Sequence, residues 1–184
     1  MAEFKKFDPI PRLSKRWIFI SEKIDGTNGC VVVDHDGAVL AQSRNRFVTP
    51  EDDNFGFARW VYQNAESLAG TLGPGHHYGE WWGVGIQRGY DLIERRFSLF
   101  NTRRWGEQFE NAPPGVPGLG VVPLLYEGVW DEHFIDRRME DLAQYGSQAA
   151  LSYMNPEGIV VFDTLTGQFY KRTFGSDDHK GKSS

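Results

Sequence analysis

The sequence predicts an α+β fold in which antiparallel β-hairpins pack against two or three helices. Two pairs of apolar, β-branched runs are each joined by a short polar turn, Asp34-His35-Asp36-Gly37 in the first pair and Thr164-Leu165-Thr166-Gly167 in the second. Between these pairs lie segments whose apolar residues recur at helical spacing. With 184 residues, of which 40% are hydrophobic and 24% are charged, the chain can fill the core of one domain.

The first half of the chain is expected to form strands and one helix. Apolar and β-branched runs predict strands at residues 17–22, 29–33, 38–43, 77–81 and 97–101. The side chains of residues 52–54 offer N-caps for a helix from about Phe55 to Leu68. The apolar residues at helical spacing in this segment are Phe57, Trp60, Val61, Ala65 and Leu68. Gly73-Pro74-Gly75 then breaks the chain before the next strand.

The second half is expected to add a helix and a closing hairpin. The predicted elements are a Pro/Gly-rich loop at 111–120, a buried strand at 121–125, a polar helix at 132–145, and strands at 158–163 and 168–173. We therefore expect one domain over residues 1–174. A polar, mobile tail is expected over residues 175–184, with no separate C-terminal domain.

Composition argues against several classes of protein. No apolar run approaches the roughly 20 residues of a membrane span, and the N-terminus has no apolar signal segment. The single cysteine, Cys30, lies in an apolar strand and cannot form an internal disulfide. The net charge of −5 argues against a protein that coats nucleic acid through its overall field, although basic pairs such as Arg103-Arg104 could line a local groove. We expect a cytoplasmic protein without a membrane segment.

The strongest chemical signal is the segment Lys23-Ile24-Asp25-Gly26-Thr27-Asn28, which follows a predicted strand. A lysine attacks phosphorus only as the neutral amine, a form that nearby cations, a bound metal or desolvation favour. Gly26 allows a tight turn, and Asn28 offers an amide to a phosphate or a ribose. By itself, the segment is equally compatible with a hairpin turn that carries an exposed lysine.

This segment and five others, in the same order, resemble the motifs of the RNA ligase family. That family is part of the covalent nucleotidyltransferases, which also include DNA ligases and mRNA capping enzymes. The five further segments are Gln42-Ser43-Arg44-Asn45-Arg46, Tyr78-Gly79-Glu80-Trp81-Trp82-Gly83, Phe97-Ser98-Leu99-Phe100-Asn101, Pro156-Glu157-Gly158-Ile159-Val160-Val161 and Tyr170-Lys171-Arg172. Each segment alone is explained as well by surface charges or core rings. Their order over residues 23–172 carries the resemblance.

The resemblance implies an adenylation domain of the ligase type, with antiparallel sheets flanked by helices. Lys23 is expected to attack ATP and form a covalent lysyl-AMP. The residues expected to bind the nucleotide are Glu22, Ile24, Asn28, Arg44 for a phosphate, Glu80 for the ribose hydroxyls, Phe100 for stacking on adenine, and Lys171 for the α-phosphate. Glu157 is expected to serve the catalytic metal, Mg²⁺ or Mn²⁺. The last motif of the family usually has two basic residues separated by one. Because Lys171 and Arg172 are adjacent, Lys171 is chosen and Arg172 is the alternative.

The implied activity is that of an ATP-dependent RNA ligase. AMP would pass from the lysine to a 5′-phosphate end, and a 3′-hydroxyl would then displace AMP and seal the strand. The implied partners are RNA ends or a nicked duplex, and a partner chain in place of the second domain that many relatives carry. The alternatives are a DNA ligase, a capping-type guanylyltransferase, or a non-catalytic module that binds nucleic-acid ends.

Two further segments invite other functional interpretations. Gly83–Tyr90 is glycine-rich but lacks the Gly-Lys-Ser/Thr ending of a P-loop, so it predicts a flexible loop beside the nucleotide pocket. His76 and His77 are neighbours on a predicted strand and therefore point to opposite faces, which argues against a shared metal. The histidines and the cysteine show no zinc-binding spacing.

Overall fold

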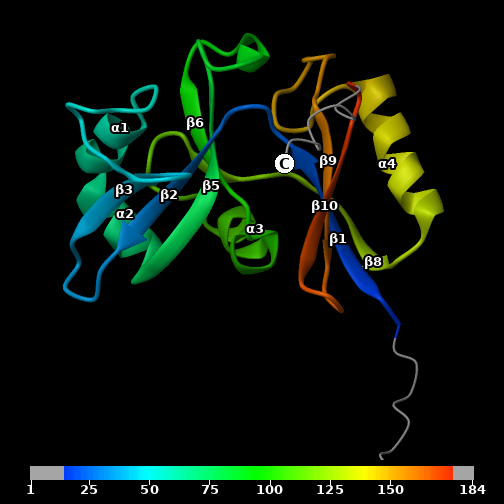
Figure 1. Cartoon of the computed structure of the whole chain (residues 1–184), viewed down its shortest axis with the longest axis horizontal. Coiled ribbons are helices and arrows are strands. Elements are labelled where there is room, and N and C mark those ends of the chain that lie inside the picture. The colour runs from blue at the N-terminus through cyan, green and yellow to red at the C-terminus, as the bar shows by residue number, and fades with distance from the viewer. Residues whose placement is uncertain (1–14, 176–184) are drawn as a thin grey trace, which may run out of the picture.

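The computed structural model describes residues 15–175 (Figure 1). The strands are β1 (Trp17–Lys23), β2 (Thr27–Val33), β3 (Val39–Ser43), β4 (Phe47–Val48), β5 (Gly75–Gly83), β6 (Arg95–Leu99), β7 (Leu119–Val121), β8 (Leu124–Val129), β9 (Gly158–Asp163) and β10 (Gln168–Thr173). The helices are α1 (Phe57–Gln63), α2 (Ala65–Leu72), α3 (Thr102–Asn111) and α4 (Glu132–Tyr145), with a 3₁₀ turn, η1, at Gly89–Asp91. The fold class is α+β, as the sequence predicts.

The strands form two sheets. The smaller sheet has the order β10-β9-β1-β8, and the larger has the order β4-β3-β2-β5-β6-β7. All neighbouring strands are antiparallel except β6 and β7, which are parallel. Helix α4 covers the outer face of the four-stranded sheet, whereas α1 and α2 cover the outer face of the six-stranded sheet (Figure 1). Each sheet is therefore covered by helices on its outer face, and the inner faces of the two sheets are available to line a binding site.

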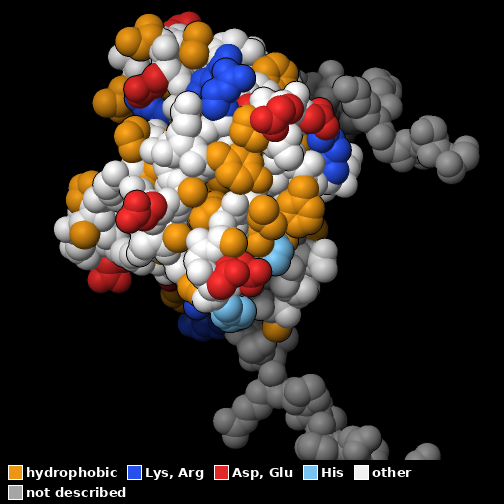
Figure 2. Space-filling view, turned by 90° about the vertical axis from the view of Figure 1, so that its left-hand side faces the viewer, with side chains coloured by type: hydrophobic (Ala, Val, Ile, Leu, Met, Phe, Trp, Pro, Cys, Tyr) orange, Lys and Arg blue, Asp and Glu red, His pale blue; other side chains and the backbone are white. Residues whose placement is uncertain are grey.

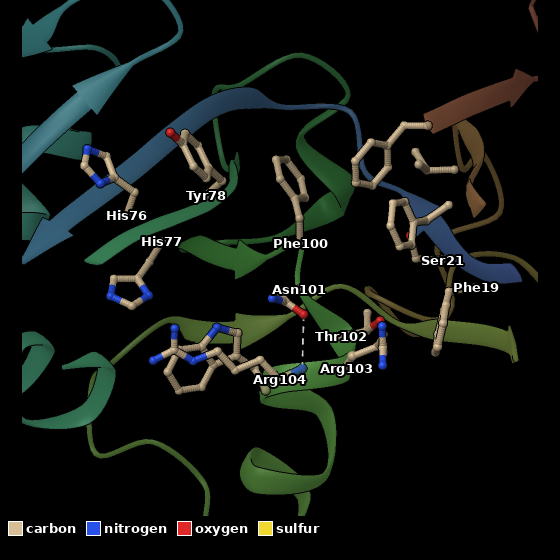
Figure 3. A pocket seen from close by; sticks show the side chains of 14 residues that line it. Phe19, Ser21, His76, His77, Tyr78, Phe100, Asn101, Thr102, Arg103 and Arg104 are labelled. Atoms are coloured by element: carbon tan, nitrogen blue, oxygen red, sulfur yellow. Dashed lines mark hydrogen bonds between the residues drawn. The ribbon is translucent and has the colours of Figure 1, made fainter. Parts of the chain in front are cut away.

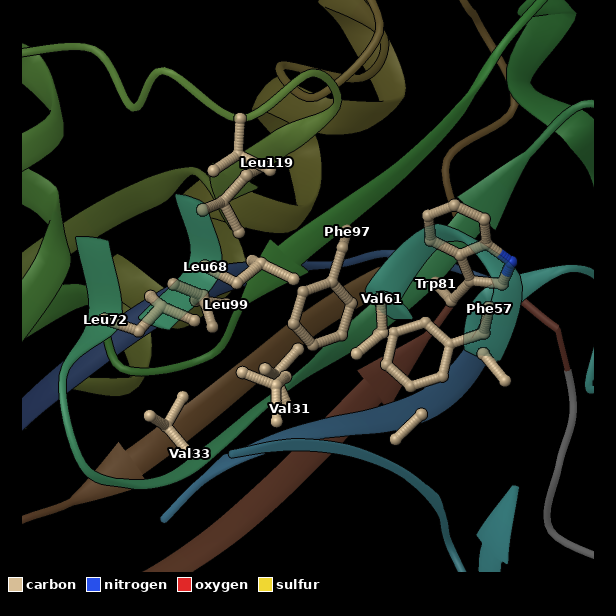
Figure 4. Close-up of a cluster of buried hydrophobic side chains, with 14 of the residues drawn as sticks. Val31, Val33, Phe57, Val61, Leu68, Leu72, Trp81, Phe97, Leu99 and Leu119 are labelled. Carbon is tan, nitrogen blue, oxygen red and sulfur yellow. The ribbon is translucent and has the colours of Figure 1, made fainter. Parts of the chain in front are cut away.

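The larger core lies between the six-stranded sheet and helices α1 and α2 (Figure 4). The ring of Phe57 packs within 5.1 Å of Phe97 and 5.7 Å of Trp81, measured between ring centroids. A side chain at Gly29 would collide with the Phe57 ring, at 2.7 Å from its Cζ. The high aromatic content of the sequence thus serves largely to fill this core.

A second core lies between the four-stranded sheet and α4. Ile18, Ile20, Ile159 and Val161 are fully or almost fully buried and meet Leu142 of the helix. These side chains come from alternate positions of β1 and β9 because successive side chains of a strand point to opposite faces. The intervening residues of both strands therefore point toward the six-stranded sheet.

The chain crosses between the sheets at two adjacent places. The first crossing, Ile24–Gly26, joins β1 to β2, and the second, Val122–Pro123, joins β7 to β8. The backbone N–H of Glu22 donates to the carbonyl of Pro123 at 3.0 Å. Ile24 and Val122 are both buried in a third apolar cluster, which contains Trp82, Tyr90 and Ala150. Residues next to Lys23 are therefore anchored where the two sheets meet.

Most predicted elements are confirmed, including both hairpins, helix α4 and the buried position of Cys30. The helix predicted at 55–68 is instead two helices, because the chain bends at Asn64, which ends α1 and begins α2. The N-cap of α1 is Gly56 and not one of residues 52–54 as predicted, although the Asp53 carboxylate accepts the N–H of Ala58 in the first turn at 2.7 Å. Helix α3 and strand β4 were not predicted.

The strand predicted at Val121–Leu125 is wrong. Val121 ends β7 in the six-stranded sheet, and Leu124 begins β8 in the other sheet. Pro123, which lacks an N–H, lies at the switch between the sheets. The apolar run is thus shared by two strands with different partners.

Two expectations concern the ends of the chain and the membrane. Apart from Gly175, the tail predicted at residues 175–184 lies outside the described residues. No helix within residues 15–175 is long and apolar enough to cross a membrane.

Figure 2 views the molecule from the side of α1 and α2, and apolar side chains gather near the middle of that face with charged side chains around them.

Candidate active site

A cavity of about 810 Å³ opens between the two sheets (Figure 3). Both sheets and the start of α3 line it, with Phe19, Ser21, His76, His77, Tyr78, Phe100, Asn101, Thr102, Arg103, Arg104, Trp105, Val160, Phe162 and Phe169. These residues include aromatic rings and two arginines but no Asp or Glu, although the chain carries a net charge of −5. The cavity therefore suits a ligand that combines a flat ring with negative charge.

Phe100 and Val160 line this cavity from opposite sheets. Phe100 follows β6. Its N–H donates to the carbonyl of Tyr78 at 2.9 Å, which fixes the backbone position from which the side chain projects. Its ring is 40% exposed and points into the cavity (Figure 3). Val160 lies on the inner face of β9, as does Ser21 on β1, its partner in the sheet. A ring on one wall and an apolar side chain on the other make a slot for a planar base.

A second cavity, of about 180 Å³, lies next to the first. The two cavities share Tyr78 and Phe100, and the smaller one extends to Asn28 and Arg44. A ligand that fills both would have its ring near Phe100 and would reach the guanidinium of Arg44.

Lys23 and Glu157 form an ion pair at the junction of the two sheets. Lys23 Nζ lies 2.5 Å from Glu157 Oε2, and the two side chains are 25% and 13% exposed. Lys23 points inward because β1 alternates, with Phe19 and Ser21 on the same face. The pair unites residues 134 positions apart in the sequence.

A glycine after Glu157 allows this approach. Gly158 has φ +150° and pairs with Lys23 across β1 and β9. A Cβ at this position would collide with the carbonyl oxygen of Arg172 on β10. The strand that carries Glu157 can therefore lie close to both of its neighbours only with glycine at position 158.

Three of the predicted nucleotide-binding residues form one hydrogen-bonded chain. Glu80 accepts from Asn28 Nδ2 at 3.1 Å and from the backbone N–H of Gly26 at 3.1 Å. Asn28 Oδ1 in turn accepts from Arg44 at 2.5 and 3.1 Å. These contacts link β2, β5 and the end of β3 on the face that lines the cavities.

The Glu80 carboxyl is 8% exposed, and burial raises its pKa to about 7. The charge of Lys23 and the N–H of Gly26 act against this rise, whereas Glu157 and Asp25 add to it. The Glu80 carboxyl therefore gains or loses its proton near neutral pH, and the positive charge of Lys23 favours its ionised form.

Position 26 requires glycine for close packing, and not for the tight turn that the sequence suggests. Its φ is not in the left-handed region. A Cβ at Gly26 would instead lie 2.5 Å from the carbonyl oxygen of Trp81 and 2.8 Å from the Cβ of Trp82. The glycine allows the segment after Lys23 to lie directly on β5.

The register of β10 separates Lys171 from Arg172. Lys171 pairs with Val160, so both side chains lie on the inner face of the four-stranded sheet. Arg172 pairs with Ile159, lies on the outer face and forms an ion pair with Asp136 of α4. The alternation thus favours Lys171 over Arg172 as the basic residue of the last motif.

The side chains of Glu22 and Ile24 point away from the cavity. The Glu22 carboxylate is 1% exposed and accepts from Ser147 Oγ at 2.6 Å and from the N–H groups of Gln148 and Ala149 at 2.7 and 3.0 Å. Burial raises the Glu22 pKa, and these hydrogen bonds oppose the rise. Because Ile24 lies in the third cluster, any nucleotide contact from these two positions must use main-chain atoms.

The two histidines have unrelated environments. His77 is buried, its Nε2 is 2.8 Å from the carbonyl oxygen of Gly73, and burial lowers its pKa. His76 is exposed. Within residues 15–175, no group of three His, Cys, Asp or Glu side chains is arranged to hold a metal ion. A cation such as Mg²⁺ needs no such group, because it keeps several waters and can bind through one carboxylate and substrate phosphates.

Sequence reasoning missed several residues that line or support the site. Val160 and Ser21 could have been found from the alternation of their strands once Lys23 was assigned to the inner face. Arg88 and Tyr90, which contact Asp25, lie in a glycine-rich segment with no recognisable pattern. The segment was predicted to be a flexible loop beside the nucleotide pocket; it does contact the segment after Lys23, but these contacts and the packing of Tyr90 hold it in place.

Comparison with known families identifies the protein at the family level. The RNA ligase family matches residues 16–173, which is most of the chain. This chain belongs to the RNA ligase family. Among curated proteins, none matches the chain.

Solved structures of an RNA ligase family protein share the fold. A variant of Naegleria gruberi RNA ligase with ATP and Mn aligns with a TM-score of 0.62 at 17% identity, and another variant with AMP and Mn aligns with a TM-score of 0.62 at 19% identity. The same ligase with PPi aligns with a TM-score of 0.63 at 18% identity. Each comparison covers 86% of this chain and 50% of the other, so this family member spans about half the length of those proteins.

Proposed function

We propose that this protein transfers AMP from ATP to Lys23 and then to a nucleic-acid end. The observation that carries the proposal is the Lys23–Glu157 pair, at 2.5 Å, which lies beside a cavity built for a flat ring with negative charge. The six-motif order in the sequence and the family match support the same activity. The Naegleria gruberi ligase structures with ATP, AMP and PPi support these three species as substrate, transferred group and product.

The nucleoside fits along the inner face of the six-stranded sheet. Adenine stacks on Phe100, with Val160 on the opposite wall of the slot. Glu80 accepts a hydrogen bond from a ribose hydroxyl when its carboxylate is ionised. Main-chain atoms at Glu22 and Ile24, where the chain leaves β1, supply the remaining contacts that were expected from these positions.

The phosphates lie toward the basic side chains. Arg44, held by Asn28, is directed by its planar guanidinium toward two phosphate oxygens at once. Lys171, on the inner face of β10, contacts the α-phosphate. Glu157 would hold a divalent metal, Mg²⁺ or Mn²⁺, which when bound would supply positive charge that balances the triphosphate and favours the neutral lysine amine.

The first step forms one bond and breaks one bond. Lys23 Nζ gives one proton to solvent water and becomes the neutral amine, whose lone pair attacks the α-phosphorus opposite the bridging oxygen. That oxygen leaves with pyrophosphate, and the nitrogen gives a second proton to solvent. A phosphoramide N–P bond joins AMP to Lys23. The held geometry of Lys23 and the positive charges around the phosphates lower the barrier by orienting the attack and stabilising charge.

The later steps would act on an RNA 5′-phosphate and 3′-hydroxyl. AMP passes to the 5′-phosphate, and the hydroxyl then displaces AMP to form the phosphodiester. RNA is proposed as the substrate because the chain belongs to the RNA ligase family. A partner chain that completes the grip on the RNA, and a cytoplasmic location, remain predictions from the sequence.

Intact mass tests the first step. The protein is incubated with ATP and Mg²⁺ or Mn²⁺, and a mass increase equal to one AMP is expected and should map to Lys23. Lys23→Ala should show no increase, whereas Lys15→Ala, which changes an exposed lysine outside the cavity, should behave as the wild type. An unmodified wild type that still binds nicked RNA would leave the non-catalytic end-binding module as the function.

The choice of nucleotide and acceptor distinguishes the remaining alternatives. Incubation with GTP in place of ATP should give no covalent product, in contrast to a capping-type guanylyltransferase. Matched RNA and DNA strands with a nick are then offered to the adenylated protein. Transfer of AMP to the RNA 5′-phosphate and not to DNA supports an RNA ligase, and the reverse preference supports a DNA ligase.

A further inference from the structure

Arg88 bridges the two segments that carry the Lys23–Glu157 pair. Its Nε donates to Asp25 Oδ2 at 2.9 Å. Its second nitrogen, Nη1, donates to the side-chain oxygen of Asn155 at 3.0 Å and to the Asn155 carbonyl at 3.3 Å. Asp25 lies two residues after Lys23, and Asn155 lies two residues before Glu157. One guanidinium therefore joins the backbone on both sides of the ion pair.

The planar fork of arginine is suited to this bridge. A guanidinium presents several N–H groups in one fixed plane, so it can hold a carboxylate and an amide at a defined separation. The side chains of Arg88 and Asp25 are 28% and 27% exposed, so solvent partly screens the pair. The value of the contact therefore lies in the geometry that it imposes on Asp25 and Asn155 more than in its electrostatic strength.

The loop that carries Arg88 is itself firmly held. Tyr90 is 1% exposed, its hydroxyl accepts the N–H of Asp25 at 2.9 Å, and its ring packs against Trp82 and Tyr153 at 5.0 and 4.6 Å between centroids. The 83–91 segment therefore makes a second contact to the residue that Arg88 holds. Tyr153 belongs to the loop that leads to Asn155, so the ring contact ties the same two segments together.

Backbone conformation shows that this loop is constrained. Within residues 15–175, five non-glycine residues have positive φ, and three of them are Gln87, Tyr90 and Asp91. Left-handed conformations of such residues cost free energy and persist where surrounding contacts enforce them. Here the enforcing contacts are those of Tyr90 and Arg88 with the segments that flank Lys23 and Glu157.

We propose that Arg88 is a positioning residue for the adenylation of Lys23, and that it acts by fixing the separation of the Lys23 and Glu157 segments. This inference rests on the proposed function. Arg88 contacts Asp25 and Asn155, which lie close to Lys23 and Glu157 in the sequence, so we assign it an action through these two residues and not a contact with ATP. Loss of Arg88 should therefore reduce the rate of the chemical step and leave ATP binding nearly intact.

The test compares the rate of AMP gain over a range of ATP concentrations in the full chain. Arg88→Ala should lower the rate at saturating ATP by about 10- to 100-fold, because small displacements of a reacting group have effects of this size. The ATP concentration that gives half the maximal rate should change by less than about threefold, since ground-state binding is retained. Arg137→Ala, which breaks exposed ion pairs on α4, is the matched control and should keep the wild-type rate.

Two further measurements separate positioning from a general loss of structure. Added guanidinium ion, at concentrations that leave the wild-type fold and rate unchanged, should restore part of the rate of Arg88→Ala. Asn155→Ala removes the side-chain contact on the far side of the bridge, leaves the longer contact with the carbonyl, and should slow the reaction less than Arg88→Ala does. Combining it with Arg88→Ala should add little, because both changes break the same bridge.

The outcomes keep the two proposals distinct. A wild type that gains no AMP overturns the proposed function, whatever Arg88 does. If the wild type gains AMP and Arg88→Ala matches its rate, or is slow only because ATP binds more weakly, the role of Arg88 is overturned. Should Arg88→Ala fail to fold, Arg88→Lys and Asn155→Ala carry the test, and wild-type rates for both overturn the proposal.

Discussion

The two faces of the four-stranded sheet use neighbouring residues for opposite purposes. On the face toward α4, Glu22 is buried in a hydrogen-bonded network, and Arg172 pairs with Asp136. On the face toward the cavity, Lys23 pairs with Glu157, and Lys171 shares a row with Val160. Each site residue is thus the direct neighbour of a residue that supports the fold.

This contrast shows why a motif cannot be interpreted as a set of equivalent residues. A strand places alternate side chains on opposite faces, so a segment that is read as one functional unit divides into a chemical half and a structural half. In the segment Glu22–Asn28, Lys23 and Asn28 face the site, whereas Glu22 and Ile24 are buried on the other side. Mutations at adjacent positions should therefore have different effects, one on the reaction and the other on the stability of the fold.

The sharpest test of the contrast is the pair Lys171 and Arg172. Lys171→Ala should lower the rate of Lys23 adenylation by about 100- to 1,000-fold, as is typical when a group that stabilises transition-state charge is removed. Arg172→Ala breaks only a pair whose side chains are 50% and 57% exposed, which is worth about 1 kcal/mol or less. The rate of covalent AMP gain is measured for both. A larger loss in Arg172→Ala would show that the faces have been assigned the wrong way round.

Substitutions at Glu22 test the role of the residues on the face toward α4. Glu22→Ala leaves Ser147 Oγ and the N–H groups of Gln148 and Ala149 without their acceptor, and the free energy of unfolding should fall by about 3–4 kcal/mol. Glu22→Gln keeps one acceptor oxygen and should lose about 1 kcal/mol. Denaturant titration measures both changes. Equal stability of the alanine variant and the wild type would contradict the structural role.

Glu80 extends the comparison to the six-stranded sheet. Its pKa rises from an ordinary value of 4.5 to about 7 on burial, so the folded state binds a proton more tightly than the unfolded state. Its contribution to stability is therefore fully present below about pH 4.5 and is lost as pH rises through about 7. That difference corresponds to at most about 3 kcal/mol.

Glu80→Gln removes this titration, so the stability of the wild type relative to the variant should fall between pH 5 and pH 8, roughly the range over which the carboxyl ionises. Denaturant titration at several pH values measures the difference. The buried Glu22 carboxyl is present in both proteins, so its own titration cancels. A difference that does not change with pH would mean that Glu80 titrates near its ordinary pKa.

The smallest effect is expected at the base-binding slot. Phe100→Ala should weaken ATP binding by about 1–2 kcal/mol, because stacking on one aromatic ring is worth about this much. Phe100→Trp should retain most of the affinity. Phe47→Ala, which changes an exposed ring on β4, is the control and should bind ATP like the wild type. The affinities are measured in Lys23→Ala, where covalent reaction cannot interfere.

Local signals predicted much of the fold. Both hairpins follow from turn residues between β-branched runs, and α4 follows from its spacing and from Asp131, whose side chain accepts the N–H of His133. Helix α3 has only two large apolar residues, Trp105 and Phe109, and it contains Gly106, so few positions indicate a helix although these two share one face. The assignment of β7 and β8 to different sheets depends on long-range pairing, which no local pattern contains.

The order of the motifs proposes Lys23, Glu80 and Glu157 as site residues, and their roles stay predictions. The 2.5 Å contact of Lys23 with Glu157, 134 positions away in the sequence, appears only in three dimensions. The structure brings together Asn28, Arg44 and Glu80 as expected. Arg88 could not have been predicted, because its partners Asp25 and Asn155 are defined by the packing of two loops.

The order of strands in the two sheets has a consequence for the synthesis of the protein. The six-stranded sheet is made of one continuous stretch, residues 27–121, whereas the two partners of β1 are made much later, β8 from residue 124 and β9 from residue 158. As the chain leaves the ribosome, the larger sheet can therefore be completed first, with Lys23 already made but lacking Glu157 and Lys171. If the proposed function holds, the nascent chain can react with ATP only after β9 has joined β1 and β10 has joined β9.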